Sequence, residues 1–106
     1  MTEKELLEEV RKLAALHGWL FYHTHDSHRS EPGFPDVVLA NANHRIIFLE
    51  LKREGKGLSD ERKVTKTGRV LPSQVDWAFT LMHADGVEYG GPFWPSDLEW
   101  LAGRMQ

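Results

Sequence analysis

Two acidic residues and one lysine lie at the ends of apolar segments that have the composition of strands. Asp36 begins the segment 36–40, and Glu50 and Lys52 end the segment 45–52. Glu50 and Lys52 are two residues apart, so they share one face of a strand. Charge at the end of a buried strand is unfavourable unless it is paired or binds a ligand. These three residues are therefore the first candidates for chemistry.

A divalent cation would explain the two carboxylates. Asp36 and Glu50 would repel each other if they lay side by side, and a hard cation with oxygen ligands, Mg²⁺ or Mn²⁺, removes that penalty. Lys52 could then contact a phosphate oxygen or an attacking water as a compact point charge. The alternative is a structural strand end, in which Lys52 neutralises Glu50 and Asp36 caps a turn.

The pairing of the two strands decides whether the three residues can meet. Opposed residues on antiparallel strands share a face, so Asp36 must pair with an even-numbered residue to join Glu50 and Lys52. We predict that Asp36 lies opposite or diagonal to Glu50. This requires an odd-length loop, 42–44 or 41–45, because a two- or four-residue turn would put Asp36 on the other face.

The remaining patterns predict helices on both sides of a sheet. The spacing predicts a helix over 2–17, with Thr2 and Glu5 as a capping box and Gly18 as its end. Strands are expected over 19–23, 36–40, 45–52 and 87–89, broken at Gly90, and further helices over 72–83 and 97–102. The segments 36–40 and 45–52 are apolar on both faces, which is typical of central strands. The order helix, three strands, helix, strand, helix predicts one α/β domain over residues 1–106 with a mixed sheet.

Composition excludes several classes of protein. The chain has 106 residues, of which 41% are hydrophobic and 27% charged, as in ordinary globular proteins. No apolar run reaches the roughly 20 residues of a membrane helix. The absence of cysteine excludes disulfides, thiolate-bound zinc and thiol catalysis. We expect a cytoplasmic protein with no membrane partner.

Positive charge is concentrated in one stretch. The net charge is −3, yet residues 52–69 carry +4, so the remainder carries −7. A basic stretch on an acidic body can follow a phosphate backbone. The alternative is a solvated, mobile loop.

The motifs resemble the PD-(D/E)XK nuclease superfamily, and within it the VRR-NUC domains. The resemblance rests on Gly18-Trp19, Tyr22-His23-Thr24, Gly33-Phe34-Pro35-Asp36, Glu50-Leu51-Lys52, Leu71-Pro72-Ser73-Gln74 and Trp94-Pro95-Ser96-Asp97. It implies a restriction-endonuclease-like core and a Mg²⁺-dependent (or Mn²⁺-dependent) DNA endonuclease that leaves a 5′-phosphate. Stand-alone, phage-type members look like Holliday-junction resolvases and form homodimers.

The resemblance also implies roles for individual residues. Asp36, Glu50 and the main-chain carbonyl of Leu51 would hold the metal, Lys52 would orient or activate water, and Gln74 would support the site. The expected partners are branched DNA and a second copy of the chain, with no nucleotide cofactor. A phage- or bacterium-encoded protein of this kind would act in the cytoplasm of the host cell. The alternatives are a nuclease for flaps, nicks or duplex, and a DNA-binding module with a vestigial metal site.

One departure concerns the glutamine. In the family it follows the lysine closely, whereas 21 residues separate Lys52 from Gln74 here. The extra segment, roughly 60–70, is the basic one, and we interpret it as an insertion that could reach along DNA. Whether it displaces Gln74 stays open at this point.

The resemblance also implies that a glutamate of the first helix lies at the metal. Glu3 lies within the apolar stripe of Leu6 and Val10 on a helical projection, so we expect it to point inward. The alternative is a first-turn glutamate favoured by the helix dipole. The residues expected to contact DNA are His23, Arg29, Arg53, Lys56, Arg62, Lys63, Lys66 and Arg69. A zinc site of His23, His25 and His28 is a less specific alternative.

Overall fold

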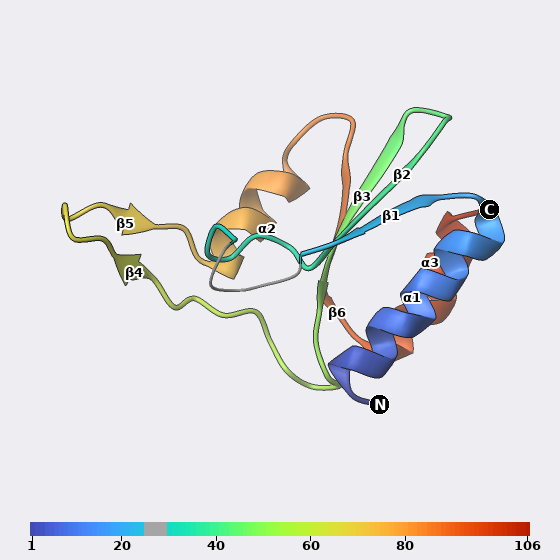
Figure 1. Cartoon of the computed structure of the whole chain (residues 1–106), viewed down its shortest axis with the longest axis horizontal. Coiled ribbons are helices and arrows are strands. Elements are labelled where there is room, and N and C mark those ends of the chain that lie inside the picture. Colours follow the sequence, from blue (N-terminus) through green and yellow to red (C-terminus); the bar gives the residue numbers. More distant parts are fainter. Residues whose placement is uncertain (25–29) are drawn as a thin grey trace.

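A four-stranded mixed sheet organises the molecule. The computed structural model describes residues 1–24 and 30–106 and is shown in Figure 1. The strands are β1 (Leu20–His23), β2 (Val37–Asn41), β3 (Arg45–Leu51) and β6 (Glu88–Phe93). Their order is β1-β2-β3-β6; the first three are antiparallel, and β6 runs parallel to β3. The predicted α/β class with a mixed sheet is confirmed.

Helices cover both faces of this sheet. On one face lie α1 (Glu3–His17) and α3 (Leu98–Arg104), and on the other lies α2 (Gln74–Met82), as Figure 1 shows. A short 3₁₀ turn, η1 (Pro95–Asp97), precedes α3. The α1/α3 side holds the main core: Leu6, Val10, Ala14, Trp19, Val37, Leu39, Ile47, Leu49, Leu51, Phe93, Leu101 and Met105. No helix in the described ranges has the length and apolar character needed to cross a membrane.

The capping box predicted at the start of α1 is present. The Thr2 N–H donates to Glu5 Oε1 at 3.0 Å, and the Glu5 N–H donates to Thr2 Oγ1 at 3.1 Å. Leu6 and Val10 are fully buried against the sheet. The cap and this packing place the start of α1 beside the ends of β1 and β3 and the beginning of β2, where His23, Leu51 and Asp36 lie.

A three-residue loop fixes the pairing of β2 with β3. Asn41 pairs with Arg45, which leaves residues 42–44 as the loop. Asn41 Oδ1 accepts hydrogen bonds from the Asn43 and Arg45 N–H groups, and His44 adopts a left-handed conformation (φ 64°). The odd loop length predicted from the sequence is confirmed. Because Val37 pairs with Leu49, the next position in register places Asp36 opposite Glu50, also as predicted.

Strand β6 is longer than the sequence indicated. Leu49 pairs with Gly90 and Leu51 with Phe93, so an irregularity in the ladder accommodates Gly91 and Pro92 opposite Glu50. A side chain at position 91 would lie 2.3 Å from the Tyr89 hydroxyl oxygen. Glycine and proline therefore form a bulge here and do not end the strand.

Residues 53–72 form an arm that projects from the body (Figure 1). Within it, β4 (Lys63–Val64) and β5 (Val70–Leu71) pair as a short antiparallel hairpin. The sequence indicated an irregular loop in this region. The hairpin lacks the apolar alternation that would have marked it, and its strands are exposed apart from the partly buried Leu71.

The segment leading into Asp36 is packed tightly against α2. Gly33 has φ 81°, and a Cβ there would lie 2.4 Å from the Ser73 carbonyl carbon. The Trp77 indole N–H donates to the Pro32 carbonyl at 3.2 Å, and the Phe34 ring lies 5.0 Å from the Trp77 ring. These contacts fix where Asp36 enters the sheet.

We expect Gly33→Ala to destabilise the protein by about 2 to 4 kcal/mol, because it adds backbone strain and a steric clash with Ser73. Chemical denaturation measures this change. Gly57→Ala is the matched control, since Gly57 has open space around its Cβ position, and it should change stability little. Equal stabilities of the two variants would contradict the packing described.

Candidate functional site

Asp36 is held by the backbone of both neighbouring strands. Its Oδ2 accepts a hydrogen bond from the Leu51 N–H at 2.9 Å, and its carbonyl accepts one from the Thr24 N–H at 2.9 Å. The Thr24 hydroxyl donates to the Pro35 carbonyl at 3.1 Å. The carboxylate is therefore tied to the end of β3, next to Glu50.

Glu50 is a buried carboxyl group whose hydrogen bonding is incomplete. Only 2% of the surface of Glu50 is exposed to solvent. Oε1 accepts a hydrogen bond from Gln74 Nε2 at 2.9 Å, whereas Oε2 has no hydrogen-bond donor among the described residues. An ionised carboxylate in this position pays a desolvation cost that one amide cannot offset.

The ionisation of Glu50 reflects this environment. Burial, followed by the charge of Asp36, raises the pKa of Glu50 to about 9; Lys52 opposes the shift and Glu3 adds to it. In the absence of a cation, Glu50 therefore holds a proton at neutral pH. Asp36 and Glu50 are together called the acidic pair.

Gln74 connects this pair to the arm. It is the first residue of α2, and its Oε1 accepts a hydrogen bond from the Ser59 N–H at 2.8 Å. That bond leaves Nε2 to donate to Glu50. Gln74 therefore reaches Glu50 although 21 residues separate it from Lys52, because the base of the arm folds back against the start of α2.

Lys52 lies directly beyond β3. Its N–H donates to the Phe93 carbonyl at 2.9 Å, and its charge lowers the pKa of Glu50. Leu51 lies between Glu50 and Lys52 in the sequence, is buried, and donates its N–H to the Asp36 carboxylate. The pairing of β2 with β3 therefore brings Asp36, Glu50, Leu51 and Lys52 together, as the spacing predicted.

The expectation that Glu3 points inward is wrong. Glu3 is exposed, although the first turn of α1 lies beside the end of the sheet. It nevertheless lines a cavity of about 220 Å³ together with Lys4, Leu7, His23, Asp36 and Leu51. Glu5 is used in the capping box, and Glu8 and Glu9 pair with Arg11 and Lys12. Among the glutamates of α1, Glu3 is thus the one that faces Asp36 and Glu50, and it lies at the edge of this cavity.

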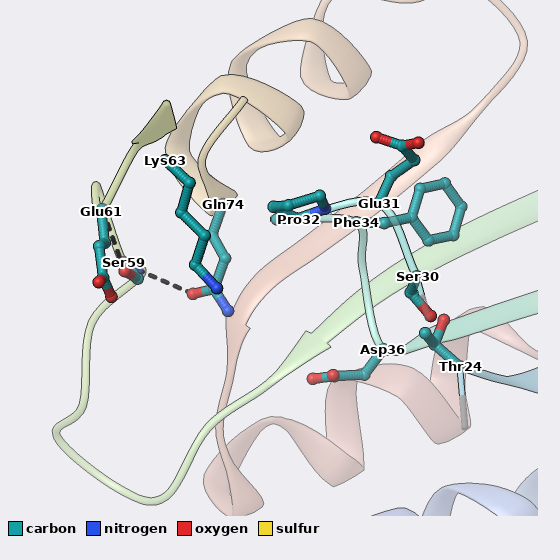
Figure 2. Close-up of a pocket in the computed structure, with 11 residues that line it drawn as sticks. Thr24, Ser30, Glu31, Pro32, Phe34, Asp36, Ser59, Glu61, Lys63 and Gln74 are labelled. Atoms are coloured by element: carbon teal, nitrogen blue, oxygen red, sulfur yellow. Dashed lines mark hydrogen bonds between the residues drawn. The ribbon is translucent and has the colours of Figure 1, made fainter. Parts of the chain in front are cut away.

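A larger cavity of about 420 Å³ opens on the other side of Asp36 (Figure 2). It lies between the 30–36 segment and the arm, and Asp36 and Gln74 are among the residues that line it. From the arm come Ser59, Glu61 and Lys63. Figure 2 shows the Asp36 carboxylate pointing into this space.

The chemistry of the pair suits a hard cation. Glu50 Oε2 is a buried oxygen without a donor, and a cation shared with Asp36 would favour the ionised form of Glu50. Among the described residues, no three His, Cys, Asp or Glu side chains are grouped as a metal site. Asp36 and Glu50 would therefore need the Leu51 carbonyl, Glu3 or water to complete a coordination sphere.

The basic residues fall into different environments. Arg62 pairs with Asp60 at 3.0 Å and with Asp76, so it helps to hold the arm. Arg53, Lys56, Lys63, Lys66 and Arg69 are exposed along the arm. Arg29, His25 and His28 lie outside the described residues, so the zinc alternative of His23, His25 and His28 stays untested.

Two residues near the pair were missed by sequence reasoning. Ser59 orients Gln74 through a backbone N–H, for which no side-chain signal exists. Tyr89 lies close enough to the pair that burial, followed by the charges of Glu50 and Asp36, raises its pKa. Its position follows from the pairing of β6 with β3, which joins segments distant in sequence and could not be derived from local pattern.

We expect Glu50→Gln to stabilise the cation-free protein by about 1 to 3 kcal/mol at pH 8. Below about pH 4.5 the Glu50 carboxyl is protonated in both states, whereas between 4.5 and 9 only the folded state retains the proton. Its contribution to stability therefore falls as pH rises through this window. Denaturation at pH 4, 6 and 8 measures the difference, with the exposed Glu99→Gln as control. Parallel pH profiles for wild type and Glu50→Gln would contradict the assignment.

Comparisons with known proteins provide no family for this chain. No protein-family model, no curated protein and no solved structure matches it. The resemblance to nucleases stays a prediction from the motifs, and the case for a function rests on the acidic pair and its surroundings.

Proposed function

We propose that the protein is a divalent-metal-dependent DNA endonuclease that hydrolyses phosphodiester bonds. The observation that carries the proposal is the buried Glu50 carboxyl, which lies in register with Asp36 and has one oxygen without a donor. Lys52 follows on the same side of the strand and supplies a cation. A structural strand end gains nothing from a buried carboxyl oxygen without a donor, whereas a divalent cation would use that oxygen as a ligand.

The finer fold assignment is part of this proposal. The element order predicted for a restriction-endonuclease-like core is α-β-β-β-α-β-α, and α1, β1–β3, α2, β6 and α3 follow it once the arm is set aside. In this assignment the acidic pair lies where the expected metal site would be.

The chain's own residues have distinct roles in the proposed reaction. Asp36, Glu50 and the Leu51 carbonyl would hold Mg²⁺ or Mn²⁺, with Glu3 at the rim. When bound, the cation supplies Lewis-acid polarisation of a phosphoryl oxygen. Lys52 would orient the attacking water and, as a cation, favour the loss of its proton to solvent, while Gln74 keeps Glu50 oriented. Water adds to phosphorus, the bond to the 3′-oxygen breaks, and that oxygen takes a proton, leaving a 5′-phosphate.

Branched DNA is the proposed substrate, and a second copy of the chain is the proposed partner. The arm carries exposed basic residues beyond the site, which supports contact with a DNA backbone away from the cut. Helix α2 exposes an apolar stripe of Val75, Phe79 and Met82. Such a stripe supports pairing of two copies, as a Holliday-junction resolvase requires.

The first test is cleavage of labelled four-way junctions, flaps and duplex with Mg²⁺ or Mn²⁺. We expect the junction to be cut, and Asp36→Asn and Lys52→Ala to lower the rate by about 100-fold or more, because each removes an interaction at the reacting phosphate. Asp85→Asn, in the exposed turn after α2, is the control and should cut normally.

Different outcomes of that test separate the alternatives. Cutting of flaps or duplex as readily as junctions would contradict the resolvase assignment. DNA binding without any cutting would favour a binding module with a vestigial metal site.

The second test is metal binding without DNA. Mn²⁺ at about 100 times its dissociation constant should stabilise the wild type by about 2.7 kcal/mol, because only the folded state assembles the pair. Glu50→Gln and Asp36→Asn should lose this effect, and Glu99→Gln should keep it. Thermal denaturation and calorimetric titration measure it, and equal stabilisation of all four proteins would contradict a metal at Asp36 and Glu50.

A further inference from the structure

Lys63 differs from the other basic residues of the arm because it faces the site. It lines the larger cavity together with Asp36 and Gln74. Figure 2 shows its side chain extending from the arm toward Gln74, with the ammonium group directed into the cavity. Lys63 forms no ion pair with any residue in the described part of the chain, so its charge is available for a ligand.

The position of Lys63 is set by the attachment of the arm to α2. The Ser59 carbonyl accepts a hydrogen bond from the Val75 N–H at 3.3 Å, and the Ser59 N–H donates to Gln74 at 2.8 Å. Arg62, the residue before Lys63, forms ion pairs with Asp60 and Asp76. Lys63 therefore follows a segment that is anchored at two places, whereas Lys66 lies at the hairpin tip.

The charge of the cavity requires a cation if a phosphate is to enter. Glu31, Asp36 and Glu61 line it, and Lys63 is the one cation among the described lining residues. An anionic ligand would be repelled by these carboxylates unless positive charge faces it. The volume of about 420 Å³ is within the roughly 300–1,000 Å³ range of small-ligand sites, which suits one nucleotide of a strand and not a duplex.

We propose that Lys63 forms a phosphate-binding subsite at this cavity, opposite Asp36, for a backbone phosphate of the strand that is cut. The proposal rests on the proposed nuclease function and deepens it. The arm then does more than increase affinity for DNA, because through Lys63 it positions the strand relative to the acidic pair. Lys66 and Arg69, farther out, contribute attraction to the backbone only.

The test is single-turnover cleavage by the full chain with Mg²⁺ or Mn²⁺, on the best-cut DNA of the panel, over a range of protein concentrations. This separates the rate at saturation from the half-saturating concentration. We expect Lys63→Ala to lower the saturated rate by about 10-fold or more, and Lys63→Arg to restore part of it, because the charge at the subsite positions the reacting strand. Lys66→Ala should mainly raise the half-saturating concentration, with a smaller loss of rate than Lys63→Ala.

Controls separate the possible failures. Lys12→Ala, on the exposed side of α1, should change neither parameter, and all variants should unfold at the wild-type temperature because these lysines are exposed. If the wild type cuts but Lys63→Ala matches Lys66→Ala, the subsite is overturned and the nuclease function stands. If the wild type cuts no DNA with either metal, the nuclease function is overturned and the subsite with it.

Discussion

The burial of the Glu50 carboxyl opposite Asp36 is the constraint around which the other features are arranged. A carboxylate that is 2% exposed, with a second carboxylate beside it, is unfavourable in the folded state. The protein offsets only part of this cost, through the Gln74 amide and the charge of Lys52. The folded chain therefore stores an electrostatic imbalance at one end of the sheet, which either a proton or a cation can relieve.

The surrounding structure keeps this imbalance in place. The three-residue loop of the β2–β3 hairpin sets the register, and the bulge in β6 leaves room for Gly91 and Pro92 opposite Glu50. Gly33 and the aromatic contacts of Phe34 hold the segment before Asp36 against α2. None of these contacts neutralises either carboxyl group. They restrict its position, which is what pre-organisation of a site requires.

The arm has two physical roles. Its base is joined to the first turn of α2, where Ser59, Gln74 and Glu50 form one chain of hydrogen bonds. Its outer part is a small exposed hairpin that buries little and carries positive charge. The base of the arm thus supplies the bond that orients Gln74.

Local pattern was sufficient for the elements and for the pairing of β2 with β3. Alternation has a period of two and a short loop permits few registers, so the sequence alone is enough to place Asp36, Glu50 and Lys52 on one face. Their burial, and hence the proton held by Glu50, depended on helices and strands brought from elsewhere. The exposure of Glu3, the bulge in β6, the proximity of Tyr89 and the direction of Lys63 likewise follow from contacts between segments far apart in the chain. Such contacts are set by packing and not by local propensity, so only the folded molecule reveals them.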